Sequence, residues 1–201
     1  MKRITAIILA GGKSSRMGFD KAFLRIRHRP IIADILDKLK NIFDEILIVI
    51  SPSRAFGYSA NSTDLRVVSD VFPEKGPLGG IYTGLLNSKT KYNFVAACDM
   101  PFLNAALIRY LVEHKGDYDI IIPKMGKEFH PLFGIYSKNC IGVIEERLKQ
   151  NKLRIADIFP KVKTHFISIS EIKKIDPKLL SLMNINTPDD FKKAKEVLIY
   201  A

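Results

Sequence analysis

The residues best suited to do chemistry lie in a loop that follows the first apolar run of the chain and extends from Ala10 to Lys21. Its glycines allow backbone N–H groups to converge on an anion, its serines add hydroxyl donors, and its basic side chains add positive charge. The residues concerned are Gly11, Gly12, Lys13, Ser14, Ser15, Arg16 and Lys21. This composition indicates a phosphate-binding loop, although a basic surface loop with permissive turns has the same composition.

Two familiar phosphate loops do not fit the spacing. A Walker A loop needs a glycine five residues before the glycine of Gly-Lys-Ser, and that position relative to Gly12 holds Ile7. The dinucleotide fingerprint needs Gly-x-Gly-x-x-Gly, which Gly11, Gly12 and Gly18 do not supply. Composition alone therefore leaves the type of phosphate loop open.

Two aspartates follow apolar runs, and one of them, Asp99, could face the same crevice as the phosphate loop. Asp99 comes directly after the run 92–98, where an aspartate is ordinarily a turn residue. Beside a phosphate loop, its carboxylate could instead hold Mg²⁺ against phosphate oxygens, with phosphates and waters completing the octahedron. Asp70 could equally cap the end of a short strand. The histidines and cysteines show no metal-ligand or catalytic-triad spacing, which suits phosphoryl chemistry that needs no covalent nucleophile.

The elements that must position these residues alternate between strands and helices. Continuous apolar runs, typical of parallel strands covered on both faces, occur at 4–9, 46–50, 92–98 and 120–122, the last halted by Pro123, with shorter candidates at 65–68 and 132–136. Helical spacing of apolar residues predicts helices over 31–42, 78–86, 105–112, 140–148 and 188–198, with Pro30 in the first turn of the first helix and Thr187 as N-cap of the last.

This alternation predicts an α/β fold of the Rossmann-like, doubly wound type. We expect three α/β/α layers around a mostly parallel sheet, with a mixed edge formed by residues 130–170. Ligands bind beyond the carboxyl ends of the strands in such sheets. No repeat or linker interrupts the pattern, so residues 1–201 are expected to form one domain.

Net charge and composition limit the classes of molecule that the chain could bind. A net charge of +11, from 32 Lys and Arg against 21 Asp and Glu, suits a nucleotide, a phosphorylated substrate, a nucleic acid or a membrane surface, or serves solubility. Basic and aromatic residues are not clustered together, which argues against nucleic acid, and the apolar run 4–10 is too short to span a bilayer. Cys98 and Cys140 lie in apolar surroundings, as expected of buried thiols in a cytoplasmic protein.

Several segments together resemble one enzyme family. The string Leu9-Ala10-Gly11-Gly12-x-Ser14-x-Arg16-Met17-Gly18-x-Asp20-Lys21 is similar to the signature of molybdenum cofactor guanylyltransferases, shared in outline with wider nucleotidyltransferases. Further similar segments are Asp70 before Gly76-Pro77-Leu78-Gly79-Gly80-Ile81, then Cys98-Asp99-Met100-Pro101-Phe102, His130-Pro131-Leu132 and Asn184-Ile185-Asn186-Thr187-Pro188. The matches extend from residue 5 to residue 190 and are weak between residues 140 and 180.

The resemblance implies transfer of GMP from GTP to the terminal phosphate of molybdenum-bound molybdopterin, with release of pyrophosphate. It implies a catalytic set of Lys21, Arg16 and Asp99, with Asp99 as the ligand of Mg²⁺. The implied nucleotide-binding residues are Leu9, Ala10, Gly11, Gly12, Lys21, Asp70, Gly79, Gly80, Asp99 and Asn186. The resemblance also implies GTP and molybdopterin as partners, and it is compatible with cofactor-delivery or acceptor proteins as further partners.

Two rival functions remain at this stage. One is a sister cytidylyltransferase that uses CTP on a pterin or another phosphorylated acceptor, since the residues do not decide between GTP and CTP. The other is a nucleotide-binding module without activity, against which the presence of both Lys21 and Asp99 argues.

Overall fold

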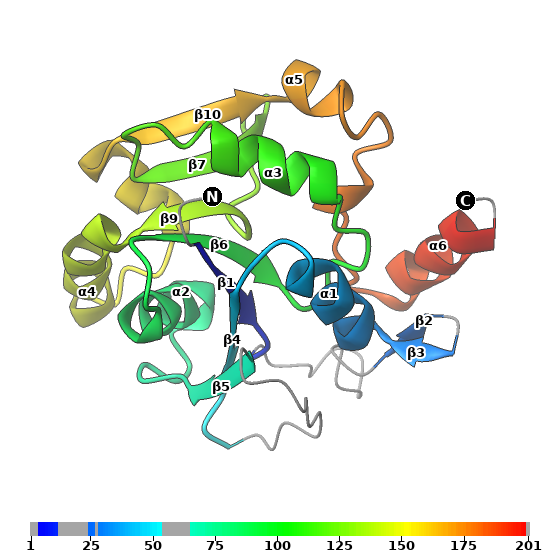
Figure 1. Cartoon of the computed structure of the whole chain (residues 1–201). Helices are drawn as coiled ribbons and strands as arrows, with labels where there is room; N and C mark the ends of the chain where they lie inside the picture. Colours follow the sequence, from blue (N-terminus) through cyan, green and yellow to red (C-terminus); the bar gives the residue numbers. More distant parts are fainter. Residues whose placement is uncertain (1–3, 12–23, 27, 54–64, 200–201) are drawn as a thin grey trace.

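The computed structural model of the chain describes residues 4–11, 24–26, 28–53 and 65–199 (Figure 1). One mixed sheet dominates it, in the order β10-β7-β9-β6-β1-β4-β5, with β8 paired to β7 and a separate β2–β3 hairpin. The strands are β1 (Thr5–Leu9), β2 (Arg25–Ile26), β3 (Arg29–Pro30), β4 (Glu45–Ile50), β5 (Leu65–Ser69), β6 (Tyr92–Ala97), β7 (Ile120–Met125), β8 (Glu128–Phe129), β9 (Phe133–Ser137) and β10 (Thr164–Ser168).

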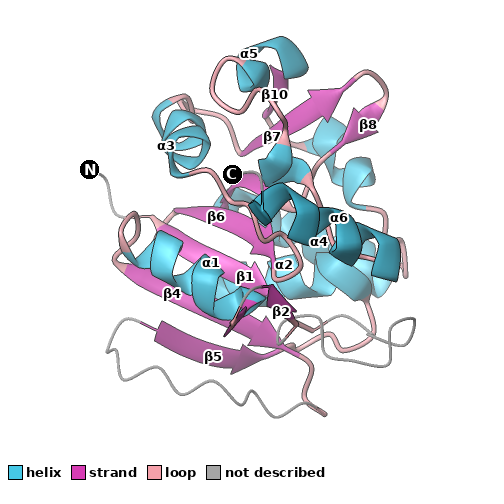
Figure 2. Ribbon diagram, turned by 90° about the vertical axis from the view of Figure 1, so that its right-hand side faces the viewer, coloured by secondary structure: helices cyan, strands magenta, loops and turns pink. Residues whose placement is uncertain are grey.

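Helices cover both faces of this sheet. The α-helices are α1 (Ile31–Lys40), α2 (Gly76–Asn87), α3 (Ala105–Glu113), α4 (Ile141–Lys149), α5 (Ile169–Lys173) and α6 (Pro188–Ile199), and the 3₁₀ helices are η2 (Lys138–Cys140), η3 (Ile155–Lys161) and η4 (Leu180–Leu182). Helices α1 and α3 pack into one core cluster, and α2 and α4 pack into the other. Figure 2 shows α1 lying over β1 and β4, on one face of the sheet.

Strand β1 shows why the chain carries continuous apolar runs. Ala6 and Ile8 belong to the cluster beneath α1, whereas Ile7 belongs to the cluster beneath α2. Successive side chains of a strand point to opposite faces, so a strand buried on both faces must be apolar at every position. The doubly wound α/β fold is thereby confirmed.

The mixed part of the sheet lies on the expected side, because β9 and β10 fall within residues 130–170 and flank β7 there. Strand β9 is antiparallel to both β6 and β7, and the remaining strands of the main path are mutually parallel. The antiparallel strand thus lies inside the sheet, and the outer strand on that side is β10, which no sequence pattern had indicated.

Two predicted boundaries near prolines were wrong. Strand β7 continues through Pro123 to Met125. Its pairing with β9 ends at Ile121 and its pairing with β8 begins at Lys124, so Pro123 lies between the two ladders. There its carbonyl accepts a hydrogen bond from the His130 N–H (3.0 Å), and its missing N–H interrupts neither ladder. Pro30 is the N-cap of α1, one residue before the first turn.

No helix within the described ranges is long and apolar enough to cross a membrane.

Candidate functional site

The carboxyl ends of four parallel strands meet at one edge of the sheet. Hydrogen bonds continue the ladder one residue beyond the strands: Ala10 N–H donates to the Val49 carbonyl (2.8 Å), and Asp70 N–H donates to the Ile50 carbonyl (2.8 Å). Cys98 N–H donates to the Leu9 carbonyl (3.1 Å). The segments after β1, β5 and β6 therefore begin side by side, where ligands bind in sheets of this type.

The first of these segments is the start of the glycine-rich loop. Leu9 is partly exposed, Ala10 is buried and Gly11 is exposed. A Cβ atom at Gly11 would lie 3.2 Å from the backbone nitrogen of Ser51, so the chain passes close to the end of β4 here. Gly12, Arg16 and Lys21, which were predicted to bind phosphate, lie outside the described residues.

The predicted glycines of α2 are packed against protein atoms. A Cβ at Gly79 would lie 2.8 Å from the Phe72 carbonyl oxygen, and a Cβ at Gly80 would lie 3.1 Å from Cδ2 of Leu9. Both glycines are buried. They bring the first turn of α2 close to β1 and to the loop after β5, which is a packing role that composition could not distinguish from contact with a ligand.

Asp70 anchors the loop that leads into α2. Its Oδ1 accepts hydrogen bonds from the Phe72 N–H (3.0 Å) and from Oγ1 of Thr83 (2.7 Å), while Thr83 Oγ1 accepts from the Val71 N–H (3.1 Å). The role of strand-end cap, one of the two readings of this residue, is therefore present in the structure. These bonds fix the backbone between β5 and α2 at the same sheet edge as Ala10, the first residue of the glycine-rich loop.

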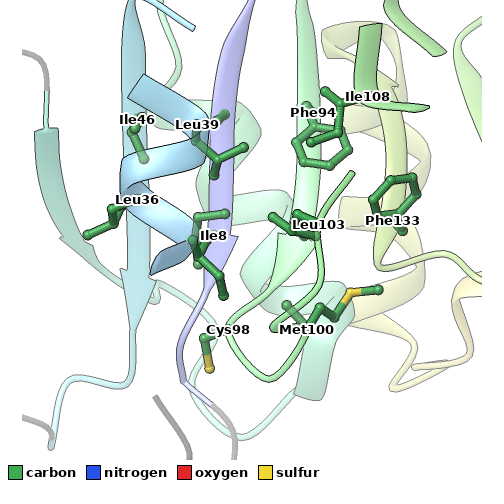
Figure 3. Packing of buried hydrophobic residues seen from close by; sticks show 14 of the residues in the cluster. Ile8, Leu36, Leu39, Ile46, Phe94, Cys98, Met100, Leu103, Ile108 and Phe133 are labelled. Carbon is green, nitrogen blue, oxygen red and sulfur yellow. The ribbon is translucent and has the colours of Figure 1, made fainter. Parts of the chain in front are cut away.

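Asp99 begins a loop that is held firmly in the core on both sides. Cys98, Met100 and Leu103 are 9%, 2% and 2% exposed, and Figure 3 shows them at the end of β6 among the core residues beneath α1 and α3. Asp99 itself is partly exposed. Because its neighbours on either side are buried in the core, packing restricts where the Asp99 carboxylate can lie at the sheet edge.

The donor set at this edge fits one kind of metal site. Among the described residues, no three His, Cys, Asp or Glu side chains gather closely enough to hold an ion. A closed zinc centre needs four protein ligands. A hard divalent cation such as Mg²⁺ needs only one or two carboxylates when substrate phosphates and waters fill the other positions, and the Asp99 carboxylate fits such an ion.

The segment before α6 reaches the same edge. Ile185 N–H donates to the Asp99 carbonyl (2.9 Å), so Asn186 lies next to the Asp99 loop although the two are 87 positions apart in the sequence. A capping box at the start of α6 fixes this segment, because Oδ2 of Asp190 accepts from the N–H groups of Asn186 (3.0 Å) and Thr187 (2.9 Å). Thr187 Oγ1 accepts from the Asp190 N–H (3.1 Å) in return, as expected of the predicted N-cap.

A histidine segment also arrives at this edge through the antiparallel strand. Phe133, the first residue of β9, pairs with Ala96 near the end of β6, so His130 and Pro131 lie beyond the carboxyl end of β6. Burial lowers the pKa of His130, with Glu128 acting in the opposite direction, and its Nε2 has no hydrogen-bond partner within the described part of the chain. The imidazole therefore favours its neutral form here.

One contributor to this edge carried a sequence signal only at its last two residues, Asn184 and Ile185. Residues 175–180 lie in the stretch where family resemblance is weak, and residues 181–183 belong to no matching segment, yet the segment 175–185 contacts the Asp99 loop through Ile175, Ser181 and Ile185. The sequence of this segment shows no apolar periodicity, so it could not be assigned to the sheet edge at Asp99 in advance. Contacts between loops so distant in the chain are fixed only by the tertiary fold.

Comparison with known proteins agrees with this architecture. The family model of the MobA-like NTP transferase domain matches residues 6–160. A probable molybdenum cofactor guanylyltransferase from Pelotomaculum thermopropionicum is 36% identical over 195 residues, which cover 97% of this chain and 93% of that protein. A molybdenum cofactor guanylyltransferase from Desulfosudis oleivorans is 34% identical over 201 residues, covering 98% of this chain and 97% of that protein.

A solved structure gives the same result at the level of the fold. The crystal structure of molybdopterin-guanine dinucleotide biosynthesis protein A from Archaeoglobus fulgidus superimposes with a TM-score of 0.84 at 25% identity, covering 98% of this chain and all of that one. Sequence relatives and structure agree over almost the full length. The chain belongs to the molybdenum cofactor guanylyltransferases of the MobA-like NTP transferase family.

Proposed function

We propose that this chain transfers GMP from GTP to the terminal phosphate of molybdenum-bound molybdopterin and thereby forms molybdopterin guanine dinucleotide. The observation that carries the proposal is the meeting, at one sheet edge, of the start of the glycine-rich loop (Ala10 and Gly11), the Asp99 loop after β6 and the Asn186 segment before α6. Two phosphorylated substrates must lie together for this reaction, and three convergent segments offer a place for both. The names of the relatives supply the substrates.

Each segment has a distinct task in this proposal. Leu9, Ala10, Gly11 and Gly12 present backbone groups to the nucleotide, and the loop bearing Asp70 together with Gly79 and Gly80 frames it from the α2 side. Asn186 faces the substrates from the segment before α6. Lys21 and Arg16 neutralise the triphosphate from the glycine-rich loop.

In the reaction, an oxygen of the terminal pterin phosphate attacks the α-phosphorus of GTP in line with the bond to the β-phosphate. The new P–O bond joins GMP to the pterin, and the broken bond releases pyrophosphate. The chain orients the two phosphates and offsets their charge, and it needs no covalent nucleophile. Mg²⁺ held by Asp99 would neutralise charge on the α-phosphate and on the leaving pyrophosphate.

Two further features belong to the proposal. Residues 1–201 act as one nucleotidyltransferase domain, because a single core cluster contains residues from Ile4 to Ala194. The chain works in the cytoplasm, where Cys98 and Cys140 persist as buried thiols. Cofactor-delivery and molybdoenzyme acceptor proteins are its expected protein partners.

The test is a turnover assay on the purified chain with Mg²⁺ and molybdenum-loaded molybdopterin, in which pyrophosphate is measured with GTP, CTP or ATP. We expect kcat/KM to favour GTP by at least about tenfold, because the hydrogen bonds that the wrong base fails to make are each worth ~1 kcal/mol. A preference for CTP would replace the proposal by the cytidylyltransferase function. Nucleotide binding without pyrophosphate release would reduce the chain to a binding module.

A further inference from the structure

We propose that Ser181, held in place by Asp176, is a positioning residue that sets the location of the Asp99 carboxylate. The inference rests on the proposed function, since it assigns Asp99 to the phosphates and their metal. It concerns residues 175–185, of which only Asn184 and Ile185 belong to a segment that the sequence singled out. We call this segment the clasp.

The clasp holds the Asp99 loop at several points. Ser181 Oγ donates to the Phe102 carbonyl (3.3 Å) and accepts from the Asn104 N–H (3.1 Å), so one hydroxyl bridges two positions of the loop. Ile185 N–H donates to the Asp99 carbonyl (2.9 Å) on the other side of Pro101. The loop is therefore attached to the clasp on both sides of its proline.

The clasp itself is fixed by a buried carboxylate. Asp176 is 6% exposed, and its two carboxylate oxygens accept from the N–H groups of Leu180 (3.2 Å) and Ser181 (2.8 Å). Its carbonyl accepts from the N–H of Leu179, which has a left-handed backbone with φ of 55°. Such a conformation is unfavourable for leucine and persists only where its surroundings impose it.

Because Ser181 is buried, a water molecule could not readily take the place of its hydroxyl group in a variant that lacks it. The residue is fully buried, and the loop residues Met100 and Leu103 beside it are 2% exposed each. With the hydroxyl removed, the Phe102 carbonyl and the Asn104 N–H, which belong to partly exposed residues, would lose the buried partner that fixes their positions. The loop would then shift, and Asp99, three residues from Phe102, would shift with it.

Ser137 provides a matched control. It is also fully buried, and its Oγ likewise donates to an acceptor, Oδ1 of Asp119 (2.8 Å), and accepts from a backbone N–H, that of Asn139 (3.1 Å). Ser137 pairs with Tyr92 at the opposite end of β6. At about 3.3 Å per strand residue, it lies on the order of 20 Å from Asp99.

The experiment compares the full chain with the variants Ser181→Ala, Ser181→Thr and Ser137→Ala. In the ligand-free protein, Ser181→Ala should speed hydrogen exchange of the Asn104 and Ile185 amides by at least about tenfold. In turnover at saturating GTP and pterin, it should raise the half-saturating Mg²⁺ concentration on the order of tenfold and lower kcat. Ser181→Thr, which keeps the hydroxyl, should recover both, and Ser137→Ala should lower Tm without changing the Mg²⁺ dependence.

An unchanged Mg²⁺ dependence in Ser181→Ala would overturn the inference, as would an equal change in Ser137→Ala, because the effect would then be a general loss of stability. The proposed function can fail separately, if the unmodified chain releases no pyrophosphate from GTP. Calorimetry of Mg²⁺–GTP binding then decides the inference. A loss of about tenfold in affinity in Ser181→Ala supports it, and equal affinity refutes it.

Discussion

Asp99 shows how a strand buried on both faces delivers a single polar side chain to the sheet edge. Cys98 before it and Met100 after it are buried, and Asp99 is the partly exposed residue between them. The apolar run and the following aspartate are both visible in the sequence, so this member of the site could be predicted. What the sequence could not supply was the reason that the carboxylate stays in place, namely the core packing of Met100 and Leu103 and the hydrogen bonds of the clasp.

Replacing Asp99 by asparagine should abolish most activity and leave the fold intact. The amide keeps the size of the side chain, and the hydrogen bond from Ile185 goes to the backbone carbonyl, which the change does not touch. The lost negative charge removes the expected metal ligand, so kcat should fall at least about 100-fold, the scale on which losing one charge-stabilising group acts. Pyrophosphate release at saturating Mg²⁺ and GTP measures the rate, and circular dichroism measures Tm.

Asp119 serves as the control for this change. Its carboxylate accepts from Ser137 Oγ (2.8 Å) and from the Lys163 N–H (3.2 Å) at the far end of the sheet. Asp119→Asn should therefore lower Tm and keep the rate. Near-normal turnover by Asp99→Asn would show that the metal is held elsewhere.

For other residues of the site, the residue type alone was not enough to predict the role. Glycines at positions 79 and 80 could make room for a ligand or for protein atoms. Phe72 and Leu9 approach them closely, and framing of the nucleotide by the same two glycines stays a prediction. Asp70 could cap a strand or face a nucleotide, and its two hydrogen bonds to the α2 side supply the cap. A residue type fixes what a side chain can do, but its neighbours decide what it does.

At the scale of elements, the strands buried on both faces were the easiest to predict. The apolar runs that gave β1, β4 and β6 match the structure to within a residue or two, because burial on both faces leaves a continuous pattern. Strand β10 and helix α5 were missed. Thr164, His165 and Phe166 of β10 are all partly exposed at the outer edge of the sheet, and α5 has five residues, too few to show helical spacing.

Helix α2 gives a test of how elements pack around the site. Gly80 and Gly84 lie one turn apart and face Leu9 and Ile7, two residues apart on β1. A Cβ at Gly84 would lie closer than 3.0 Å to two side-chain carbons of the fully buried Ile7. Gly84→Ala should therefore lower the free energy of unfolding by about 1–3 kcal/mol, the usual cost of overpacking a core, as measured by denaturant titration.

Replacing a glycine by alanine in α4 should instead raise the free energy of unfolding. Gly142 is exposed, and a Cβ there would meet no atom within 4 Å. Gly142→Ala should raise the free energy of unfolding by about 0.5–1 kcal/mol, because alanine loses less backbone entropy than glycine in a helix. If both variants shift stability in the same direction, packing of α2 on β1 is not the reason for glycine at position 84.

The whole molecule carries a net charge of +11, and both proposed substrates are anions. Such a field raises the rate of encounter with a charged ligand, and salt weakens it, since the Debye length falls from about 10 Å at 0.1 M to about 3 Å at 1 M. We therefore expect the rate of substrate encounter to depend more on where the positive charges lie than on the total charge. The exposed residues Lys192 and Lys193 lie in α6, which begins two residues after Asn186 at the site, whereas the exposed Lys89 and Lys91 lie at the amino end of β6, at the opposite edge.

Two double variants separate location from total charge. Each replacement of lysine by glutamate lowers the charge by two, so Lys192→Glu/Lys193→Glu and Lys89→Glu/Lys91→Glu both reduce +11 to +7. The α6 pair should lower kcat/KM for GTP and pterin severalfold at about 0.05 M salt and flatten its salt dependence, because the field near the site is what steers both phosphates. The pair beside β6 should change both quantities little, and kcat at saturation should stay within about twofold in either variant, since steering acts on encounter and not on the bound complex. Steady-state kinetics at several KCl concentrations measures all of these quantities, and equal effects of the two pairs would mean that the chain attracts its substrates through net charge without a local field at the site.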